Sequence, residues 1–158
     1  MRDIRVWGDP VLRTPCDAVT DFDDRLRGLC DDLLDTVTGA EGRAGLAANQ
    51  IGVSLRAFSW YVDGRAGVVV NPRLVETRGE QDGEEGCLSL PGLWFPRTRA
   101  AWAAVEGVDA DGQPVRVAGD GLLGRCLQHE CDHLDGQLYI DDLKGDLRKQ
   151  ALRAAREL

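Results

Sequence analysis

The chain has 158 residues, of which 27 are acidic and 19 are lysine or arginine, so its formal net charge at pH 7 is −8. This acidic balance argues against direct binding to nucleic acid, and the length predicts a single domain over residues 1–158. No apolar run reaches the length of about 18 residues that a membrane span needs, and no signal-peptide pattern is visible. We therefore expect no membrane partner. The odd number of cysteines, five, beside a metal-binding motif indicates a reducing, cytoplasmic location.

The first expected element is a helix near the N-terminus. Apolar residues recur at helical spacing after Asp21, and Gly39 ends the pattern. This helix should pack by one stripe, which consists of Phe22, Leu26, Leu29, Cys30, Leu33, Leu34 and Val37.

Strand patterns fill the middle of the chain. Asp63-Gly64 and Asp111-Gly112 are turn signals between neighbouring strands. An acidic cluster at residues 76–85 is expected to be a solvated loop. The expected strands cover residues 55–62, 67–70, 73–77, 100–109 and 114–118.

Two further helices are expected toward the C-terminus. The first covers residues 121–135 and stops at Gly136, and the second is amphipathic and covers residues 146–157. Antiparallel strands packed around a central helix, with one helix toward each terminus, predict an α+β fold and not a doubly wound parallel sheet.

The expected central helix carries an H-E-x-x-H motif. His129 and His133 are the only two histidines in the chain, and residues at i and i+4 share one helix face, so both imidazoles can bind one cation. Glu130 lies between them in sequence and would point close to the cation. This arrangement predicts metal-dependent hydrolysis with Glu130 as general base, in preference to two structural histidines.

A catalytic centre of the zinc type needs a third protein ligand and an open position. Cys131 is about 200° around the helix from His129, so it should pack as a small hydrophobe. Cys126 shares the face of the helix that carries the histidines. A metal bound between His129 and His133 would, however, lie about 7.5 Å from Cys126 along the helix axis, which is beyond the reach of a thiolate. Cys126 is therefore expected to line the pocket. Cys87, in an extended segment between a glycine and a proline, is the better candidate, although an isolated cysteine is more often structural.

Residues 45–52 read G-L-A-A-N-Q-I-G. Small residues allow close approach of the backbone, and the Gln50 side chain can donate a hydrogen bond to an oxyanion without adding charge. The segment alone is weak evidence, because a run of glycine and alanine more often reflects tight packing.

Three motifs taken together resemble one known family. G-L-A-A-N-Q at residues 45–50, E-G-C-L-S at 85–89 and Q-H-E-C-D-H-L-D-G at 128–136 are similar in order and spacing to those of the peptide deformylases. The resemblance covers nearly the whole chain. It implies removal of the N-terminal formyl group from nascent polypeptides that begin with formyl-methionine, with the ribosome exit as the place of encounter.

The resemblance also implies the metal site. Cys87, His129 and His133 look like the ligands of one divalent ion, with Fe2+ as the physiological metal and Zn2+, Ni2+ or Co2+ able to occupy the same site. A thiolate and two neutral imidazoles leave the ion a net charge near +1, which still lowers the pKa of a bound water. Attack by that water on the formyl carbon is the expected reaction.

Catalytic roles follow from the same resemblance. Glu130 looks like the catalytic acid/base, and Gln50 and the backbone N–H of Leu88 look like the oxyanion donors. The formyl carbon carries only a hydrogen, so a tight pocket can accept it and exclude larger acyl groups.

One segment departs from the family pattern. The family usually has G-x-G-L-A-A, whereas this chain has Arg43 at the first glycine and Ala44 at a position where a branched aliphatic is common. Arg43 would be strained if its φ had to be positive; otherwise it overhangs the cleft or points to solvent. We expect Ala44, Gly45 and Cys126 to bound the substrate's methionine pocket, with Ala44 loosening its selectivity.

Three hypotheses follow. The first is a peptide deformylase, the second is a specialised deformylase-like amidohydrolase acting on a small N-formyl or N-acyl compound, and the third is a noncatalytic metal-binding domain. Glu130 argues against the third, because metal storage needs no general base beside the ligands.

Overall fold

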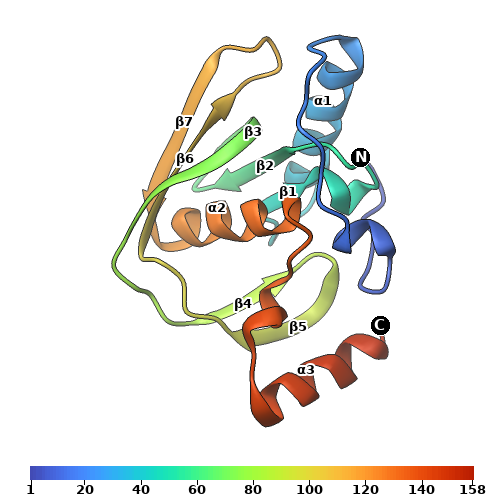
Figure 1. The fold of residues 1–158 in the computed structure, drawn as a ribbon, viewed down its shortest axis with the longest axis vertical. Coiled ribbons are helices and arrows are strands. Elements are labelled where there is room, and N and C mark those ends of the chain that lie inside the picture. The colour runs from blue at the N-terminus through green and yellow to red at the C-terminus, as the bar shows by residue number, and fades with distance from the viewer.

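The computed structural model describes residues 1–158 and has the expected α+β architecture, with three α-helices and mainly antiparallel strands (Figure 1). The strands are β1 (Gly45–Ala47), β2 (Ala57–Val62), β3 (Arg65–Arg78), β4 (Glu84–Cys87), β5 (Leu90–Pro96), β6 (Trp102–Val108) and β7 (Pro114–Asp120). The helices are α1 (Asp24–Thr38), α2 (Gly121–Leu134) and α3 (Gly145–Arg156), with short 3-10 turns at Pro10–Arg13, Ala48–Ile51 and Tyr139–Asp142.

The strands form two sheets. The larger has the order β1-β2-β3-β6-β7, so β1 lies at one edge, and the smaller is the hairpin β4-β5. Figure 1 shows α2 between the large sheet and the β4-β5 hairpin, with α3 beyond β5. The helix with the H-E-x-x-H motif is therefore enclosed by both sheets.

Alternate side chains along the strands point to opposite faces of the large sheet, and a helix packs on each face. Phe58 and Val69 are cross-strand partners that pack with α2, whereas the adjacent pair, Ala57 and Val70, packs with α1. A third apolar cluster joins β5 to the segment around Tyr139 and to α3. Helix α2 is buried along most of its length, and its polar side chains must therefore find partners inside the protein.

The helix boundaries agree closely with the sequence patterns. Helix α1 begins after Asp23, whose side chain accepts a hydrogen bond from the Leu26 N–H, so Phe22 lies outside the helix and is exposed. Helix α2 ends just before Gly136, which has a φ of 76° that favours glycine. None of the three helices combines the length and apolar character needed to cross a bilayer.

The strands differ more from expectation. The runs at residues 67–70 and 73–77 belong to one strand, β3, whose register against β6 shifts between Val70 and Arg73. Asn71 at this irregularity has a φ of 50°, and its side chain bonds both the N–H and the carbonyl of Val19. A β-bulge accommodates the Asn71-Pro72 dipeptide, so the strand continues beyond it. Strands β1, β4 and β5 lie outside the expected strand ranges, although an extended segment was expected around Cys87.

Replacing Leu33 with alanine should lower the free energy of unfolding by about 2–5 kcal/mol, because Leu33 is 0% exposed between α1 and the sheet. The control is Leu74→Ala on β3, where the side chain is 44% exposed and the loss should stay below about 0.5 kcal/mol. Urea denaturation measures both. Equal losses in the two variants would contradict the packing of α1.

Candidate metal centre

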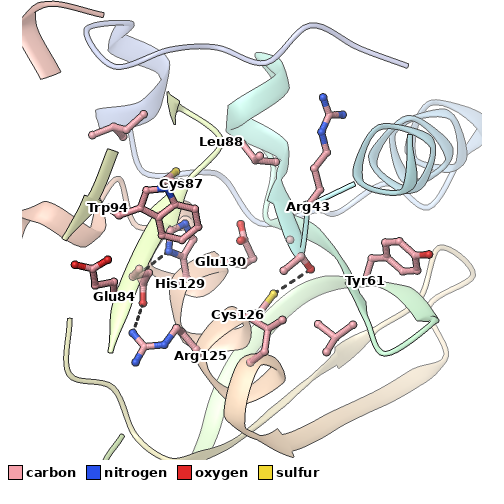
Figure 2. A pocket seen from close by; sticks show the side chains of 18 of the residues that line it. Arg43, Tyr61, Glu84, Cys87, Leu88, Trp94, Arg125, Cys126, His129 and Glu130 are labelled. Atoms are coloured by element: carbon pink, nitrogen blue, oxygen red, sulfur yellow. Dashed lines mark hydrogen bonds and ion pairs between the residues drawn. The ribbon is translucent and has the colours of Figure 1, made fainter. Parts of the chain in front are cut away.

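Three side chains with ligand atoms converge between β4 and α2. Cys87 Sγ lies 3.2 Å from His133 Nε2, which lies 3.1 Å from His129 Nε2. The three ligand atoms all lie within 4.8 Å of one another. The two histidines come from successive turns of α2, and Cys87 comes from the end of β4. Figure 2 shows Cys87 and His129 beside the pocket.

This cluster fits a divalent metal ion. In a tetrahedral site with bonds of about 2.1 Å to nitrogen and 2.3 Å to sulfur, neighbouring ligand atoms lie about 3.4–3.6 Å apart, close to the spacing of Cys87, His129 and His133. His133 Nε2 faces both Cys87 Sγ and His129 Nε2. One proton on this nitrogen can form only one strong hydrogen bond, whereas one cation can bind all three atoms. Three protein ligands leave one position open, as in catalytic centres.

Glu85 is an important residue of the centre that the sequence patterns missed. Its carboxylate bonds His129 Nδ1 at 2.7 Å, which leaves Nε2 of that histidine directed to the cluster. Arg99 donates to Glu85 at 3.0 and 2.7 Å, and Arg125 donates to it at 2.9 Å. Burial by itself would raise the pKa of Glu85, but the hydrogen bonds from Arg99 and His129 outweigh it and hold the pKa far below its usual value.

The expectation of a solvated loop at residues 76–85 is therefore wrong at both ends, because residues 76–78 belong to β3 and residues 84–85 belong to β4. Glu85 is 3% exposed, although its neighbour Glu84 is exposed. Strand β4 places alternate residues on opposite faces, so Glu85 shares the inner face with Cys87. The i, i+2 spacing of a carboxylate and a candidate ligand is the sequence signal that could have identified it.

Glu130 lies in the same buried centre. Its side chain is 3% exposed, and Oε1 has no hydrogen-bond partner. Burial raises the pKa of this carboxyl to about 7, so it can exchange a proton near neutral pH. Gly45 makes room for it, because a Cβ at Gly45 would fall 2.5 Å from Glu130 Oε2 and 2.6 Å from Cys126 Sγ.

Gln50 lies next to Cys87 and is held in one orientation. Its Oε1 accepts a hydrogen bond from the Ala47 N–H at 2.9 Å, so its Nε2 must face the other way. Nε2 donates to Ser89 Oγ at 3.0 Å and lies 3.7 Å from Cys87 Sγ. Gln50 does not itself line the adjacent cavity, whereas Leu88 does.

A cavity of about 560 Å³ opens beside the cluster. Ala44, Gly45 and Cys126, which are expected to bound the methionine pocket, all line this cavity. Cys126 Sγ donates to the Ala44 carbonyl at 3.3 Å and is not among the candidate ligands. Cys131 packs in the apolar core between α2 and the large sheet. The walls are mostly apolar, with His129 and Glu130 exposed to the interior of the cavity at one side.

Arg43 is not strained, because it is absent from the residues with positive φ. It borders the cavity, but its Nη1 donates to the Thr36 carbonyl at the end of α1, 2.6 Å away. Figure 2 shows the side chain pointing away from Glu130. Arg43 thus caps the C-terminus of α1, where a cation is favourable, and does not overhang the centre.

A Cys-His-His cluster, a buried glutamate and a cavity on an α+β frame define a metal-dependent hydrolase. A model of the polypeptide deformylase family matches residues 1–149. The chain is 56% identical over 157 residues to the peptide deformylase of Acidothermus cellulolyticus, covering 99% of this chain and 87% of the relative. It is 52% identical over 159 residues to that of Parafrankia sp., covering 99% and 86%.

Solved structures give the same result. The chain superimposes on a peptide deformylase from Legionella pneumophila with a TM-score of 0.92 and 41% identity, and on one from Thermus thermophilus with a TM-score of 0.89 and 41% identity. Each match covers 99% of this chain and 94% of the other. The chain belongs to the peptide deformylase family, a family of metal-dependent hydrolases, and the comparisons support neither of the two alternative hypotheses.

Replacing Glu85 with glutamine should weaken metal binding about 10- to 100-fold, because His129 loses the anion that orients its ring. The matched control is Glu84→Gln, one residue away on the outer face of β4. It should bind metal within about twofold of the parent, because Glu84 has no contact with the ligands. Competition for Co2+ against a chelator measures both affinities, and equal affinity in the two variants would show that Glu85 does not position the centre.

Proposed function

We propose that this protein removes the formyl group from the N-terminal formyl-methionine of nascent polypeptides, as one domain of residues 1–158 with Cys87, His129 and His133 as metal ligands. The observation that carries the proposal is the unpartnered Glu130 carboxylate oxygen beside this cluster, at the wall of a cavity large enough for a peptide end. The family membership fixes the reaction class to which this geometry belongs.

We further propose Fe2+ as the physiological metal, on the family resemblance, with Zn2+, Ni2+ or Co2+ as alternatives that a thiolate and two imidazoles also accept. The cytoplasm and the ribosome exit are the proposed place of action, since formyl-methionyl chains emerge there. The net charge of −8 supports a protein that does not bind nucleic acid directly.

A divalent ion bound to these ligands would act as a Lewis acid that activates water and polarises the formyl carbonyl. The protein's own residues do the rest. Glu130 takes a proton from the attacking water and delivers it to the nitrogen of methionine as the C–N bond breaks, so the products are formate and a free α-amine.

Charge that develops on the formyl oxygen needs hydrogen-bond donors. Gln50 is the proposed side-chain donor, because the Ala47 N–H holds its oxygen and so directs its nitrogen toward Cys87. The backbone N–H of Leu88, one residue after Cys87 at the cavity wall, is the second proposed donor.

Selectivity for formyl over larger acyl groups follows from the crowding around Glu130. No Cβ fits at Gly45, because Glu130 and Cys126 already occupy that space. We propose that the formyl group binds beside Glu130, where so little space would admit the hydrogen on a formyl carbon and exclude a methyl group. Ala44, Gly45 and Cys126 are the proposed walls of the methionine pocket, which is apolar like the thioether side chain that it receives.

The test is hydrolysis of formyl-Met-Ala-Ser beside acetyl-Met-Ala-Ser by enzyme loaded anaerobically with Fe2+ or Ni2+. We expect formate release from the first peptide and at least about 100-fold lower kcat/KM for the second. Comparable rates on both peptides, or no release of formate by the metal-loaded enzyme, would contradict the proposal.

A control for the chemistry is Glu130→Gln. The amide has almost the same shape, so fold and metal content should be kept, but it cannot carry a proton between water and the leaving nitrogen. Turnover should fall by at least about 100-fold, measured with metal content determined on the same sample. Near-parent turnover at full metal content would exclude Glu130 from the proton path.

A further inference from the structure

Trp94 is a large apolar side chain that remains at the surface. Its exposed fraction is 61%, above the values of 39% for Phe22 and 36% for Tyr61. Single exposed apolar side chains are common on protein surfaces. An exposed aromatic side chain at the wall of a cavity, however, can supply contact area to a ligand that binds in the cavity.

The indole ring is held in place by the strand opposite. Trp94 on β5 is the direct cross-strand partner of Gly86 on β4. A Cβ at Gly86 would lie only 2.8 Å from the ring, so the ring lies across the backbone of this glycine. One face of the ring is thereby packed, and little conformational freedom is lost when a ligand covers the other face.

The position of the ring relative to the centre is the second observation. Trp94 lines the same cavity as Cys87 and Glu130. Figure 2 shows it beside Cys87 and next to Glu84, whereas Arg43 and Tyr61 lie on the other side of Glu130. A peptide whose formyl end is at Glu130 and whose chain leaves the cavity on this side must pass the ring.

We propose that Trp94 is a specificity-determining residue that stacks on an aromatic or long aliphatic side chain at one of the two positions after formyl-methionine. The inference rests on the proposed function and names part of its substrate class. Side chains of an extended peptide alternate between faces, so one of two successive residues faces the ring. Glu84, exposed beside the ring, disfavours a carboxylate at the same place.

The experiment compares formyl-Met-Phe-Ser and formyl-Met-Ser-Phe with formyl-Met-Ser-Ser. The measured quantity is the ratio of kcat/KM for the better phenylalanine peptide to that for the serine peptide. In Trp94→Ala this ratio should fall about 5- to 10-fold, mainly through KM, whereas Trp94→Phe should keep most of it. Leu74→Ala, which removes an exposed apolar side chain distant in sequence from the cavity lining, should keep the parent ratio.

Trp94→Gln is a second variant, which keeps a long side chain without an aromatic face. In this variant the ratio of kcat/KM values should fall as it does in Trp94→Ala. If the parent prefers neither phenylalanine peptide, or if both variants keep the parent ratio, the role of Trp94 is overturned while formyl hydrolysis stands. If the parent releases formate from none of the three peptides, both this inference and the proposed function are overturned.

Discussion

The buried carboxylate of Glu85 is the interaction on which the geometry of the centre depends. An uncompensated charge at 3% exposure would be strongly destabilising, so the fold must supply cations to it. Arg99 arrives from the segment after β5, and Arg125 and His129 arrive from α2. The carboxylate therefore ties the β4-β5 hairpin to α2, and this link holds Cys87 against the two histidines.

The network extends beyond Glu85. Arg99 also donates to Asp132 on α2 at 2.6 Å, and the Arg125 guanidinium donates to the Arg97 carbonyl at 2.7 Å. In the last turn of the helix, Asn49 Nδ2 donates to the His133 carbonyl at 2.6 Å. Arg125 Nη2 and Asn49 Oδ1 are nevertheless buried without a hydrogen-bond partner. The network therefore contributes more to the positioning of the ligands than to overall stability.

Much of the fold and site could be predicted from the sequence. His129 and His133 are four residues apart in one helix, and helical geometry alone requires them to share a face. Gly39 and Gly136 correctly predicted where α1 and α2 end, whereas α1 begins later than predicted because Asp23, and not Asp21, caps it. These features depend on neighbours within a few positions, which is the range over which sequence patterns carry physical information.

The remainder depends on contacts between distant segments. Glu85 meets Arg99 and Arg125 across 14 and 40 residues, and these partners cannot be identified from the residues around Glu85. The sequence left open whether Arg43 overhangs the cleft or points to solvent, and only the fold shows its bond to the end of α1. Strand β4 has no alternating apolar pattern that would predict a strand, because its inner face carries a carboxylate and a thiol in place of apolar side chains.

The central claim, that one cysteine and two histidines hold a divalent ion, is tested most directly by X-ray absorption spectroscopy of the Co2+- or Zn2+-loaded protein. We predict one ion per chain, with one sulfur at about 2.3 Å, two imidazole nitrogens at about 2.1 Å and a lighter ligand at the open position. Cys87→Ala should remove the sulfur signal. A spectrum without sulfur in the parent, or an unchanged sulfur signal in Cys87→Ala, would contradict the account.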